Sequence, residues 1–303
     1  MNYKKVLLLA NPISGRGAVI RNLSKIIVAL EERGDEVTVV ISKYRGHMEE
    51  LVGDAGGYDL IVACGGDGTL NEVANGMVKH GIDVPLGYIP VGTINDFATS
   101  HSIPKSVVPA IKSVVNGVPG YVDLGMLNDR VFAYVAAFGA FTETSYKTPQ
   151  SLKNAFGKLA YLADGAMSIS KIRPINARIT ANGMIYEGDF LFGMMANSYS
   201  VGGMKIVRGD ISLCDGLSEV MLVSDPGNIS GIQNVIASIL NPKIECEYVI
   251  SFSTDRAEFE FGEEIPWTVD GDYGGSGRRF VTKTVKNAVR LVTAEKSGKA
   301  KSN

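Results

Sequence analysis

The chain has 303 residues, of which 45% are hydrophobic and 20% charged, and its formal net charge is −2. These values are typical of a soluble globular protein with one large or two medium domains, and they exclude the overall basic field of a nucleic-acid-binding protein. The three cysteines show no metal-ligand spacing, which indicates a reducing compartment.

The N-terminal segment predicts a strand rather than a targeting signal. Its apolar run, residues 6–10, is short and no small-residue cleavage site follows it. The longest nearly uncharged stretch, residues 131–141, falls well short of the roughly 20 residues that a membrane helix needs. We therefore expect a cytoplasmic protein that at most contacts the inner face of a membrane.

The first 125 residues alternate strand-like and helical patterns. Apolar runs without polar alternation predict strands buried on both faces, and segments with helical apolar spacing separate them. This order predicts a doubly wound parallel sheet that binds ligands at the carboxyl ends of its strands. The expected strands are 6–10, 37–41, 59–63 and 85–89, and the expected helices are 20–30, 48–55, one from Leu70 onward and 107–115.

Residues 61–76 place an apolar strand, a glycine turn and a helix in immediate succession. The turn reads Gly65-Gly66-Asp67-Gly68-Thr69. Its three glycines are expected to adopt positive φ and to let the backbone approach an anion closely. Amides at the start of the helix from Leu70 can then donate to phosphate oxygens, and Asp67 can hold Mg²⁺ or a water bound to it. An ordinary strand–helix turn is the alternative.

From about Val122 to Val281 the pattern changes to strand-like runs separated by turn signals. The Asn182-Gly183 pair between apolar residues is a strong hairpin signal. Two segments, 151–172 and 230–240, look helical instead. This half is therefore predicted to be a mostly antiparallel β domain, a β-sandwich or a flattened barrel, with one or two flanking helices. The expected strands are 131–137, 177–180, 184–195, 217–223, 246–251 and 257–261.

Five motifs follow one another along the chain. They are Asn11-Pro12-x-Ser14-Gly15, Gly65-Gly66-Asp67-Gly68-Thr69-Leu70-Asn71-Glu72, Pro90-x-Gly92-Thr93-x-Asn95-Asp96-Phe97-Ala98, Asp215-Gly216-Leu217 and Asp270-Gly271-Asp272. Their order and spacing resemble the diacylglycerol kinase catalytic family, in particular its soluble bacterial lipid kinases, from about residue 4 to 293. The 65–69 turn alone is shared with NAD kinases and, more loosely, with phosphofructokinases. The 92–98 element and the late Asp-Gly-Asp are much more specific to lipid kinases.

The resemblance implies ATP and Mg²⁺ as cofactors and a nucleotide site in the first domain. Ser42 stands where the family often has a threonine, and its hydroxyl can donate the same hydrogen bond. For Asn95 and Asp96, capping of the following helix is the alternative role. The implied nucleotide-binding residues are Asn11, Pro12, Ser14, Gly15, Ser42, Gly65, Gly66, Asp67, Gly68, Thr69, Leu70, Asn71, Glu72, Thr93, Asn95 and Asp96.

One departure from the family concerns a cation. The family commonly has an arginine shortly after the Phe97-Ala98 pair, whereas Thr99 and Ser100 follow here. If that arginine stabilises charge on the transferred phosphoryl group, another cation must replace it. Lys105 and Arg208 are candidates only by elimination.

The resemblance also implies a Mg²⁺ that braces the second domain. By position, Asp215 gives its side chain, and Ser212 and Leu217 give main-chain carbonyls, all hard oxygen ligands suited to this ion. A simple hairpin turn at Asp-Gly is the alternative.

Phosphoryl transfer also needs a carboxylate that orients the acceptor hydroxyl and takes its proton. Asp270 and Asp272 follow an extended segment and alternate in direction, so only one of them faces the reacting groups. The family has Asp-Gly-Glu here, and Asp272 is one methylene shorter than that glutamate. Both residues remain candidates.

We expect a nucleotide-binding α/β domain over residues 1–124, a β-rich lipid-substrate domain over 125–284, and a C-terminal segment, 285–303, that returns to the first domain. The leading interpretation is transfer of the γ-phosphoryl group of ATP to a lipid hydroxyl, with diacylglycerol as acceptor and phosphatidic acid and ADP as products, between the two domains. A NAD kinase-like enzyme and a catalytically silent nucleotide- or lipid-binding regulator are the alternatives.

Two segments suggest contact with an anionic membrane surface. From Arg278 onward the chain has eight Lys and Arg residues against Glu295 alone, a local charge of +7. Residues 147–173 interleave apolar and basic side chains, as in an interfacial helix. A solvated tail and a helix packed on the β domain are the respective alternatives. The expected partners are a lipid substrate and, transiently, that membrane, without nucleic acid. The oligomeric state, homodimer included, stays open.

Overall fold

The computed structural model describes residues 4–32, 36–140, 173–201, 204–205, 212–241 and 243–294. The helix predicted at 151–172, nearly all of the segment 147–173, and Arg208 lie outside these residues. The chain divides into two compact units, one formed by residues 1–122 and 289–303 and the other by residues 123–288. Two long strands, β5 (Val118–Leu127) and β15 (Asp272–Thr293), have residues in both units.

The first unit contains a parallel sheet. Its strands lie in the order β2–β1–β3–β4, and the end of β15 continues it in parallel, with Leu291 opposite Leu86. The predicted doubly wound α/β class is thereby confirmed. The elements are β1 (Lys5–Ala10), α1 (Ala18–Glu31), β2 (Glu36–Ile41), α2 (His47–Val52), β3 (Leu60–Gly65), α3 (Asp67–His80), β4 (Leu86–Pro90), α4 (Asp96–Ser100) and α5 (Val107–Asn116), with short 3₁₀ turns at Ser14–Arg16 and Ala55–Gly57.

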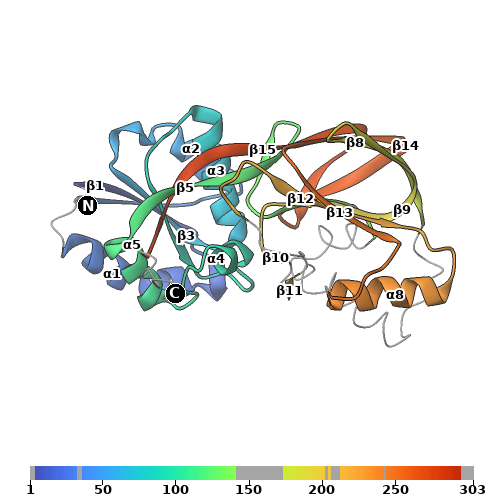
Figure 1. Cartoon of the computed structure of the whole chain (residues 1–303). Helices are drawn as coiled ribbons and strands as arrows, with labels where there is room; N and C mark the ends of the chain where they lie inside the picture. Colours follow the sequence, from blue (N-terminus) through green and yellow to red (C-terminus); the bar gives the residue numbers. More distant parts are fainter. Residues whose placement is uncertain are drawn as a thin grey trace, which may run out of the picture. The chain divides into compact units, whose positions relative to one another are not determined.

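Helices cover both faces of this sheet, which explains why its strands lack polar alternation. Every residue of β3 and β4 is buried. One face packs on α1 and α5 through a core that contains Leu8 and Val62 from the strands, Ile26 from α1 and Val114 from α5. Figure 1 shows α2 and α3 on the opposite side of the strands. The carboxyl edge of the sheet is left to the loops.

The second unit is antiparallel wherever its strands are described. Strands β9 and β14 organise it, because each pairs with β8 along its first half and with β7 along its second. Strands β12 and β13 extend the sheet from β9, and β15 extends it from β14. The elements are β6 (Arg130–Phe132), β7 (Val135–Gly139), β8 (Ile175–Ala181), β9 (Met184–Ala196), β10 (Ser200–Val201), β11 (Met204–Lys205), β12 (Ser218–Ser224), α8 (Ile229–Leu240), β13 (Val249–Thr254) and β14 (Arg256–Val269).

An aromatic core fills the space that these strands enclose. Trp267 is fully buried, and its ring centroid lies 5.0 Å from those of Phe138 and Phe259 and 5.2 Å from that of Phe280. Edge-to-face and tilted pairs at such separations are favourable aromatic contacts. This core between opposed strands of the described residues confirms the predicted sandwich class.

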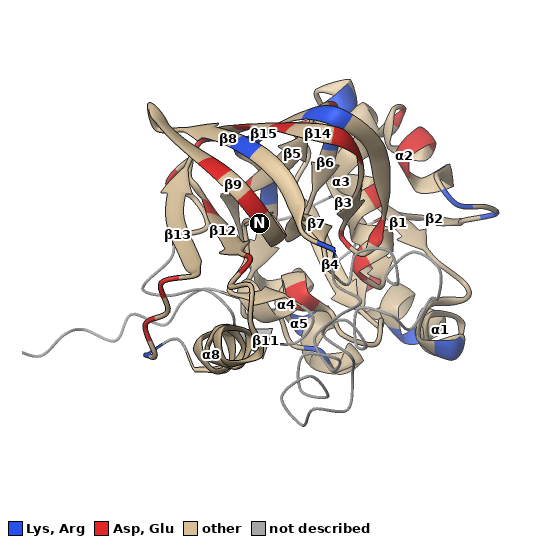
Figure 2. Cartoon of the chain, turned by 90° about the vertical axis from the view of Figure 1, so that its right-hand side faces the viewer, with Lys and Arg blue, Asp and Glu red and all other residues tan. Residues whose placement is uncertain are grey.

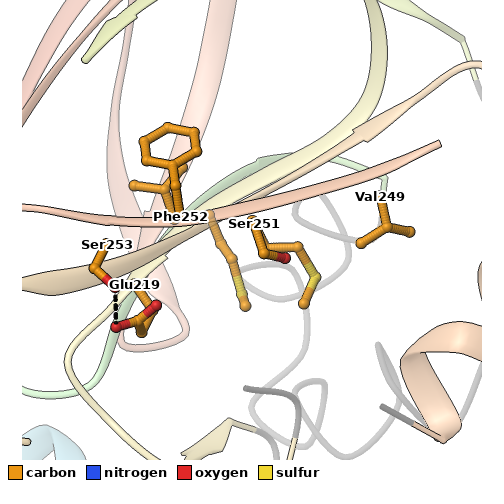
Figure 3. Close-up of a pocket in the computed structure, with 8 residues that line it drawn as sticks. Glu219, Val249, Ser251, Phe252 and Ser253 are labelled. Carbon is orange, nitrogen blue, oxygen red and sulfur yellow. Dashed lines mark hydrogen bonds between the residues drawn. The ribbon is translucent and has the colours of Figure 1, made fainter. Parts of the chain in front are cut away.

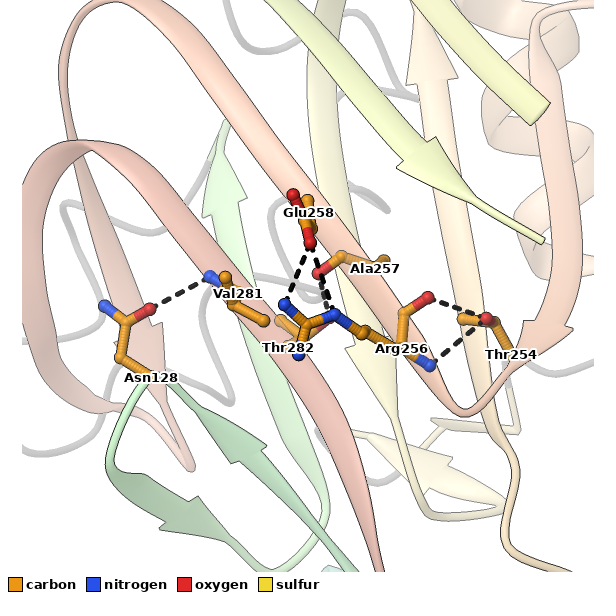
Figure 4. A network of polar contacts seen from close by, with 7 residues as sticks. All are labelled: Asn128, Thr254, Arg256, Ala257, Glu258, Val281 and Thr282. Atoms are coloured by element: carbon orange, nitrogen blue, oxygen red, sulfur yellow. Dashed lines mark hydrogen bonds and ion pairs between the residues drawn. The ribbon is translucent and has the colours of Figure 1, made fainter. Parts of the chain in front are cut away.

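The outer side of the same strands is polar. Side chains of β8 alternate strictly between buried and exposed, and Figure 2 shows acidic and basic residues along β8, β9 and β14. The Arg256 guanidinium lies 2.8 Å from Glu258, within the hydrogen-bonded network of Figure 4. Because both side chains are about half exposed, this pair contributes little to stability. We interpret this face as solvated surface rather than as a functional site.

Some predicted boundaries were wrong for identifiable reasons. The single strand predicted at 131–137 is broken into β6 and β7, because the amides of Ala133 and Tyr134 donate to the Asp270 carboxylate instead of continuing a ladder. The strand predicted at 246–251 begins later, since the Val249 amide turns back to the Cys246 carbonyl. The Asn182-Gly183 hairpin is confirmed, with φ of 52° and 73° as its turn requires.

Among the helices that the structure describes, none combines the length and the apolar composition of a membrane span.

Candidate functional site

The glycine turn between β3 and α3 is the centre of the candidate site in the first unit. Helix α3 begins at Asp67, three residues earlier than predicted. The Leu70 amide therefore donates to the Gly66 carbonyl at 3.1 Å and belongs to the helix. The N–H groups that a helix leaves without intrahelical partners precede Leu70, so the expectation that anion-binding amides start there was wrong.

The turn glycines do not adopt positive φ, which corrects the second expectation about this turn. Two of them, Gly65 and Gly66, are needed instead because a side chain would not fit. A Cβ on Gly65 would overlap the Thr69 side chain, and one on Gly66 would lie 3.3 Å from the Cα of Gly92. A Cβ on Gly68 would meet nothing within 4 Å. Gly65 and Gly66 thus permit close packing, whereas Gly68 keeps the surface open at the start of α3.

The loop after β1 is tied to this turn. Asn11 Nδ2 donates to Thr69 Oγ1 at 2.9 Å, and Asn11 Oδ1 accepts from the Ile13 amide. Gly15 has φ of 57° and lies so close to the Val91 carbonyl that a Cβ would overlap it. The Ser42 amide, just past β2, donates to the Ala10 carbonyl at 3.0 Å. The loops after β1, β2 and β3 thus meet at one edge.

The loop after β4 joins the same edge. Asp67 accepts hydrogen bonds from the amides of Asp96 at 3.3 Å and Phe97 at 3.4 Å, which caps the short helix α4. Asn95 is buried, has φ of 56°, and its Nδ2 donates to the Gly92 carbonyl at 2.9 Å. The Asn95 side chain makes no capping bond to α4, so it shapes the turn rather than the helix end.

The remaining predicted nucleotide residues differ in their surroundings. Thr93 is exposed in the loop after β4, and Pro12 and Ser14 are half-buried in the loop after β1. Glu72 accepts from the Met48 amide at 3.3 Å and thereby caps α2, while buried Asn71 accepts from Asn75. These contacts of Asn71 and Glu72 are therefore made to residues of α3 and α2.

Two residues near this edge stand out in different ways. The Lys105 amine donates to the Ile94 carbonyl at 2.6 Å, which places this candidate cation on the 92–96 turn. Tyr88, which sequence reasoning missed, is buried beneath that turn, with its hydroxyl 3.5 Å from the Gly65 carbonyl and from Asn95 Oδ1. A tyrosine inside an otherwise apolar buried strand was the available signal.

Cys64 lies at the end of β3 and is buried. Burial raises the pKa of the Cys64 thiol to about 12, so this cysteine is a packing residue rather than a reactive thiol.

In the second unit, Asp123 organises the loop that contains the predicted metal site. It is fully buried, and its two carboxylate oxygens accept from the amides of Gly216 at 2.6 Å and Asn287 at 2.7 Å. The Asn197 side chain donates to the main-chain carbonyl of Asp123. Sequence reasoning missed Asp123, although an acidic residue inside the apolar run 122–124 was a signal.

The predicted Mg²⁺ ligands lie together in that loop. The Asp215 side chain is exposed, and its Oδ1 accepts from the Leu217 amide at 3.0 Å. Ser212 Oγ accepts from the Cys214 amide at 3.4 Å. Within the described ranges, no three His, Cys, Asp or Glu side chains gather around a common point. One carboxylate with main-chain carbonyls is a donor set that fits Mg²⁺ with several retained waters.

Replacing Asp123 by asparagine is expected to destabilise the protein by about 1–3 kcal/mol, because an NH₂ group would then face one of two buried amides. Asp225→Asn is the matched control, since Asp225 Oδ1 accepts from the Gly227 amide at an exposed position and an asparagine can keep that bond. Urea unfolding of both variants measures the difference. Equal losses of stability would contradict this role for Asp123.

Asp270 and Asp272 have different environments. Asp270 has φ of 49° and is buried, and its carboxylate accepts from the amides of Ala133 at 2.6 Å and of Tyr134 and Val135 at 3.0 Å. Asp272 begins β15 opposite Val269 and is half-buried. The Asp270 carboxylate therefore holds the 133–135 turn, while Asp272 is the more accessible of the two.

Comparisons with known proteins agree over nearly the whole chain. The family model described as diacylglycerol kinase catalytic domain matches residues 5–127. A diacylglycerol kinase of Bacillus subtilis is 31% identical over 275 residues, covering 90% of this chain and 91% of that protein. One from Staphylococcus carnosus is 30% identical over 279 residues, covering 90% of each. The crystal structure of a putative diacylglycerol kinase from Bacillus anthracis has the same fold, with a TM-score of 0.83 at 24% identity over 97% of this chain and 96% of that one.

Proposed function

Because the chain belongs to the diacylglycerol kinase family, we propose that it transfers the γ-phosphoryl group of ATP to the hydroxyl of diacylglycerol, giving phosphatidic acid and ADP. The observation that carries this proposal best is the junction of three loops at the carboxyl edge of the parallel sheet. The Asn11 side chain donates a hydrogen bond to Thr69, and the Asp67 carboxylate accepts hydrogen bonds from two amides that follow β4. Phosphate sites form where such loops meet a helix N-terminus.

The proposed nucleotide contacts follow from this junction. The phosphates would lie against the first turn of α3, where Gly68 leaves the space open, with Thr93 exposed on the neighbouring loop. Lys105 is the described cation closest in sequence to that loop, and we assign it the charge that the family arginine supplies elsewhere. Asp67 would hold Mg²⁺, which neutralises phosphate charge when bound.

For the acceptor, we assign the base role to Asp272. Both oxygens of Asp270 already accept from main-chain amides, so that residue positions the turn from which Asp272 projects. Asp272 takes the proton of the lipid hydroxyl, and the hydroxyl oxygen forms a bond to the γ-phosphorus of ATP. The bond between that phosphorus and the oxygen that bridges it to the β-phosphate breaks, and ADP leaves. Ser212, Asp215 and Leu217 would hold a second, structural Mg²⁺.

We also propose that the unit of residues 1–122 and 289–303 is the nucleotide-binding domain and that the unit of residues 123–288 is the lipid-substrate domain.

The proposed location is the cytoplasm, with transient contact to an anionic membrane through the basic C-terminal segment. Two of its basic residues are partly neutralised, because Arg279 lies 3.1 Å from Glu260 and Arg290 lies 3.0 Å from Asp83. Binding to anionic vesicles should weaken with added salt, and binding that ignores salt would contradict this part of the proposal.

A kinase assay with γ-labelled ATP and a panel of acceptors tests the function. The panel contains diacylglycerol, a monoacylglycerol, a sphingoid base, undecaprenol, phosphatidylglycerol and NAD, and Asp67→Ala serves as the blank. We expect label in phosphatidic acid above all other products. Label in NADP would instead support the NAD kinase alternative. Nucleotide binding without label in any acceptor would support a silent regulator.

A further inference from the structure

The turn that carries Asp272 is held at both of its ends by one short segment, residues 130–135. Before Asp272, the Asp270 carboxylate accepts hydrogen bonds from three consecutive main-chain amides of this segment. After Asp272, the Arg130 Nη1 atom donates to the Tyr273 main-chain carbonyl at 2.5 Å. The candidate base therefore lies between two points of attachment to the same segment of chain.

Arg130 projects from a firmly anchored hairpin formed by β5 and β6. The Asn128 amide donates to the Val281 carbonyl of β15 at 2.7 Å, and the Val281 amide donates to Asn128 Oδ1 at 2.9 Å (Figure 4). Phe132, on the same strand as Arg130, is fully buried in the aromatic core. Its ring lies over Gly125 of β5, where a Cβ would overlap it. The Arg130 guanidinium is thus presented from a hairpin that is fixed both to β15 and to the core.

The bond from Arg130 differs in kind from two polar contacts elsewhere in this unit. Arg256 donates to the Glu258 side chain on the outer face. Ser253 donates to the Glu219 side chain at 2.7 Å, beside the cavity shown in Figure 3. Arg130 is half-buried and donates to a main-chain carbonyl instead. Because a hydrogen bond from an ionised donor is about twice as strong as a neutral one, this contact restrains the backbone itself.

We propose that Arg130 is a positioning residue for the general base, an inference that rests on the function proposed above. By holding the Tyr273 carbonyl, Arg130 fixes the backbone immediately after Asp272, while Asp270 fixes the backbone before it. A general base must lie within hydrogen-bond reach of the hydroxyl proton that it takes, and a displacement of about 1 Å can lower a rate by about a hundredfold. Arg130 itself neither gives nor takes a proton; it acts through Asp272.

Replacing Arg130 tests this role directly. Arg130→Met removes the donor and keeps an apolar stem, and we expect kcat for lipid phosphorylation to fall by about tenfold to a hundredfold with KM for ATP unchanged. Arg130→Lys should restore most of kcat, because the bond uses a single N–H that an ammonium can also supply. Arg256→Met, on the outer face of the same unit, is the matched control and should keep the kcat of the wild type. A wild-type kcat in Arg130→Met would overturn the proposal.

A double-mutant cycle separates positioning of the base from a general disturbance of the structure. If Arg130 acts through Asp272, adding Arg130→Met to Asp272→Asn should lower kcat no further than Asp272→Asn does alone. An additional loss as large as that of Arg130→Met in the wild type would show that Arg130 acts by another route, and it would overturn the proposal.

Amide hydrogen exchange of residues 270–274 tests the restraint without any lipid turnover. Exchange there should be faster in Arg130→Met than in the wild type or in Arg256→Met, because a hydrogen bond that holds this turn closed is lost. If the wild type phosphorylates no acceptor but exchange changes in this way, the kinase proposal fails and the restraint by Arg130 stands. If the wild type phosphorylates lipid and neither kcat nor exchange responds to Arg130→Met, only the positioning role fails.

Discussion

Asp272→Asn is expected to lower kcat for lipid phosphorylation by about 10²–10⁴-fold, the usual contribution of a positioned general base. The substitution preserves shape and removes the ability to accept a proton. Because Asp272 lies at the start of β15, outside the loops to which we assign the phosphates, ATP affinity should stay unchanged. Steady-state kinetics and calorimetric ATP titration measure the two quantities.

Two companion variants separate this role from a structural one. Asp272→Glu restores the residue that the family resemblance implies, and it should retain activity within about tenfold of the wild type. Asp270→Asn should instead lower the free energy of unfolding by about 1.5–3 kcal/mol, because a carboxylate that accepts three amide hydrogen bonds would be lost. A stable, inactive Asp270→Asn beside an active Asp272→Asn would reverse the assignment.

Gly68→Ala is expected to weaken ATP binding by at least about tenfold, or about 1.4 kcal/mol, without loss of stability. Its Cβ would meet no atom within 4 Å, so the folded protein accommodates it. Alanine in the first turn of α3 should even raise stability by about 0.5–1 kcal/mol, since glycine is the poorer helix former. The new methyl group would occupy the space that we assign to the phosphates.

The control for this prediction is Gly57→Ala. That glycine also lies in a helical turn and its Cβ would likewise meet nothing within 4 Å, but it lies away from the three loops. It should change neither ATP affinity nor the melting temperature by much. If Gly68→Ala binds ATP as tightly as Gly57→Ala does, the phosphates do not lie at the start of α3.

The parallel sheet could be predicted because strands buried on both faces leave an unmistakable record of uninterrupted apolar runs. The hairpin at Asn182 could be predicted because its positive φ angles demand particular residues. The roles of the turn glycines could not, since what crowds Gly65 and Gly66 is a threonine one helical turn on and a glycine from another loop. Local sequence indicates that a glycine is required, but it does not show whether positive φ or lack of space for a Cβ is the reason.

The candidate site was predictable as a set of motifs but not as a set of partners. Asp270 looked equivalent to Asp272 because the amides that engage it come from Ala133, Tyr134 and Val135, far away in the chain. Asp123 was overlooked because its partners, Gly216 and Asn287, are equally distant. Main-chain amides carry no residue identity, so no pattern of residue types reveals them.

The double role of Asp67 has a consequence for the loop after β4. This carboxylate opens α3 and also holds the amides of Asp96 and Phe97, through bonds of 3.3 and 3.4 Å that lie beyond the usual optimum. Because the same carboxylate would also hold Mg²⁺, the ion and the loop after β4 would share one protein ligand. The position of that loop would then depend on whether the ion is bound.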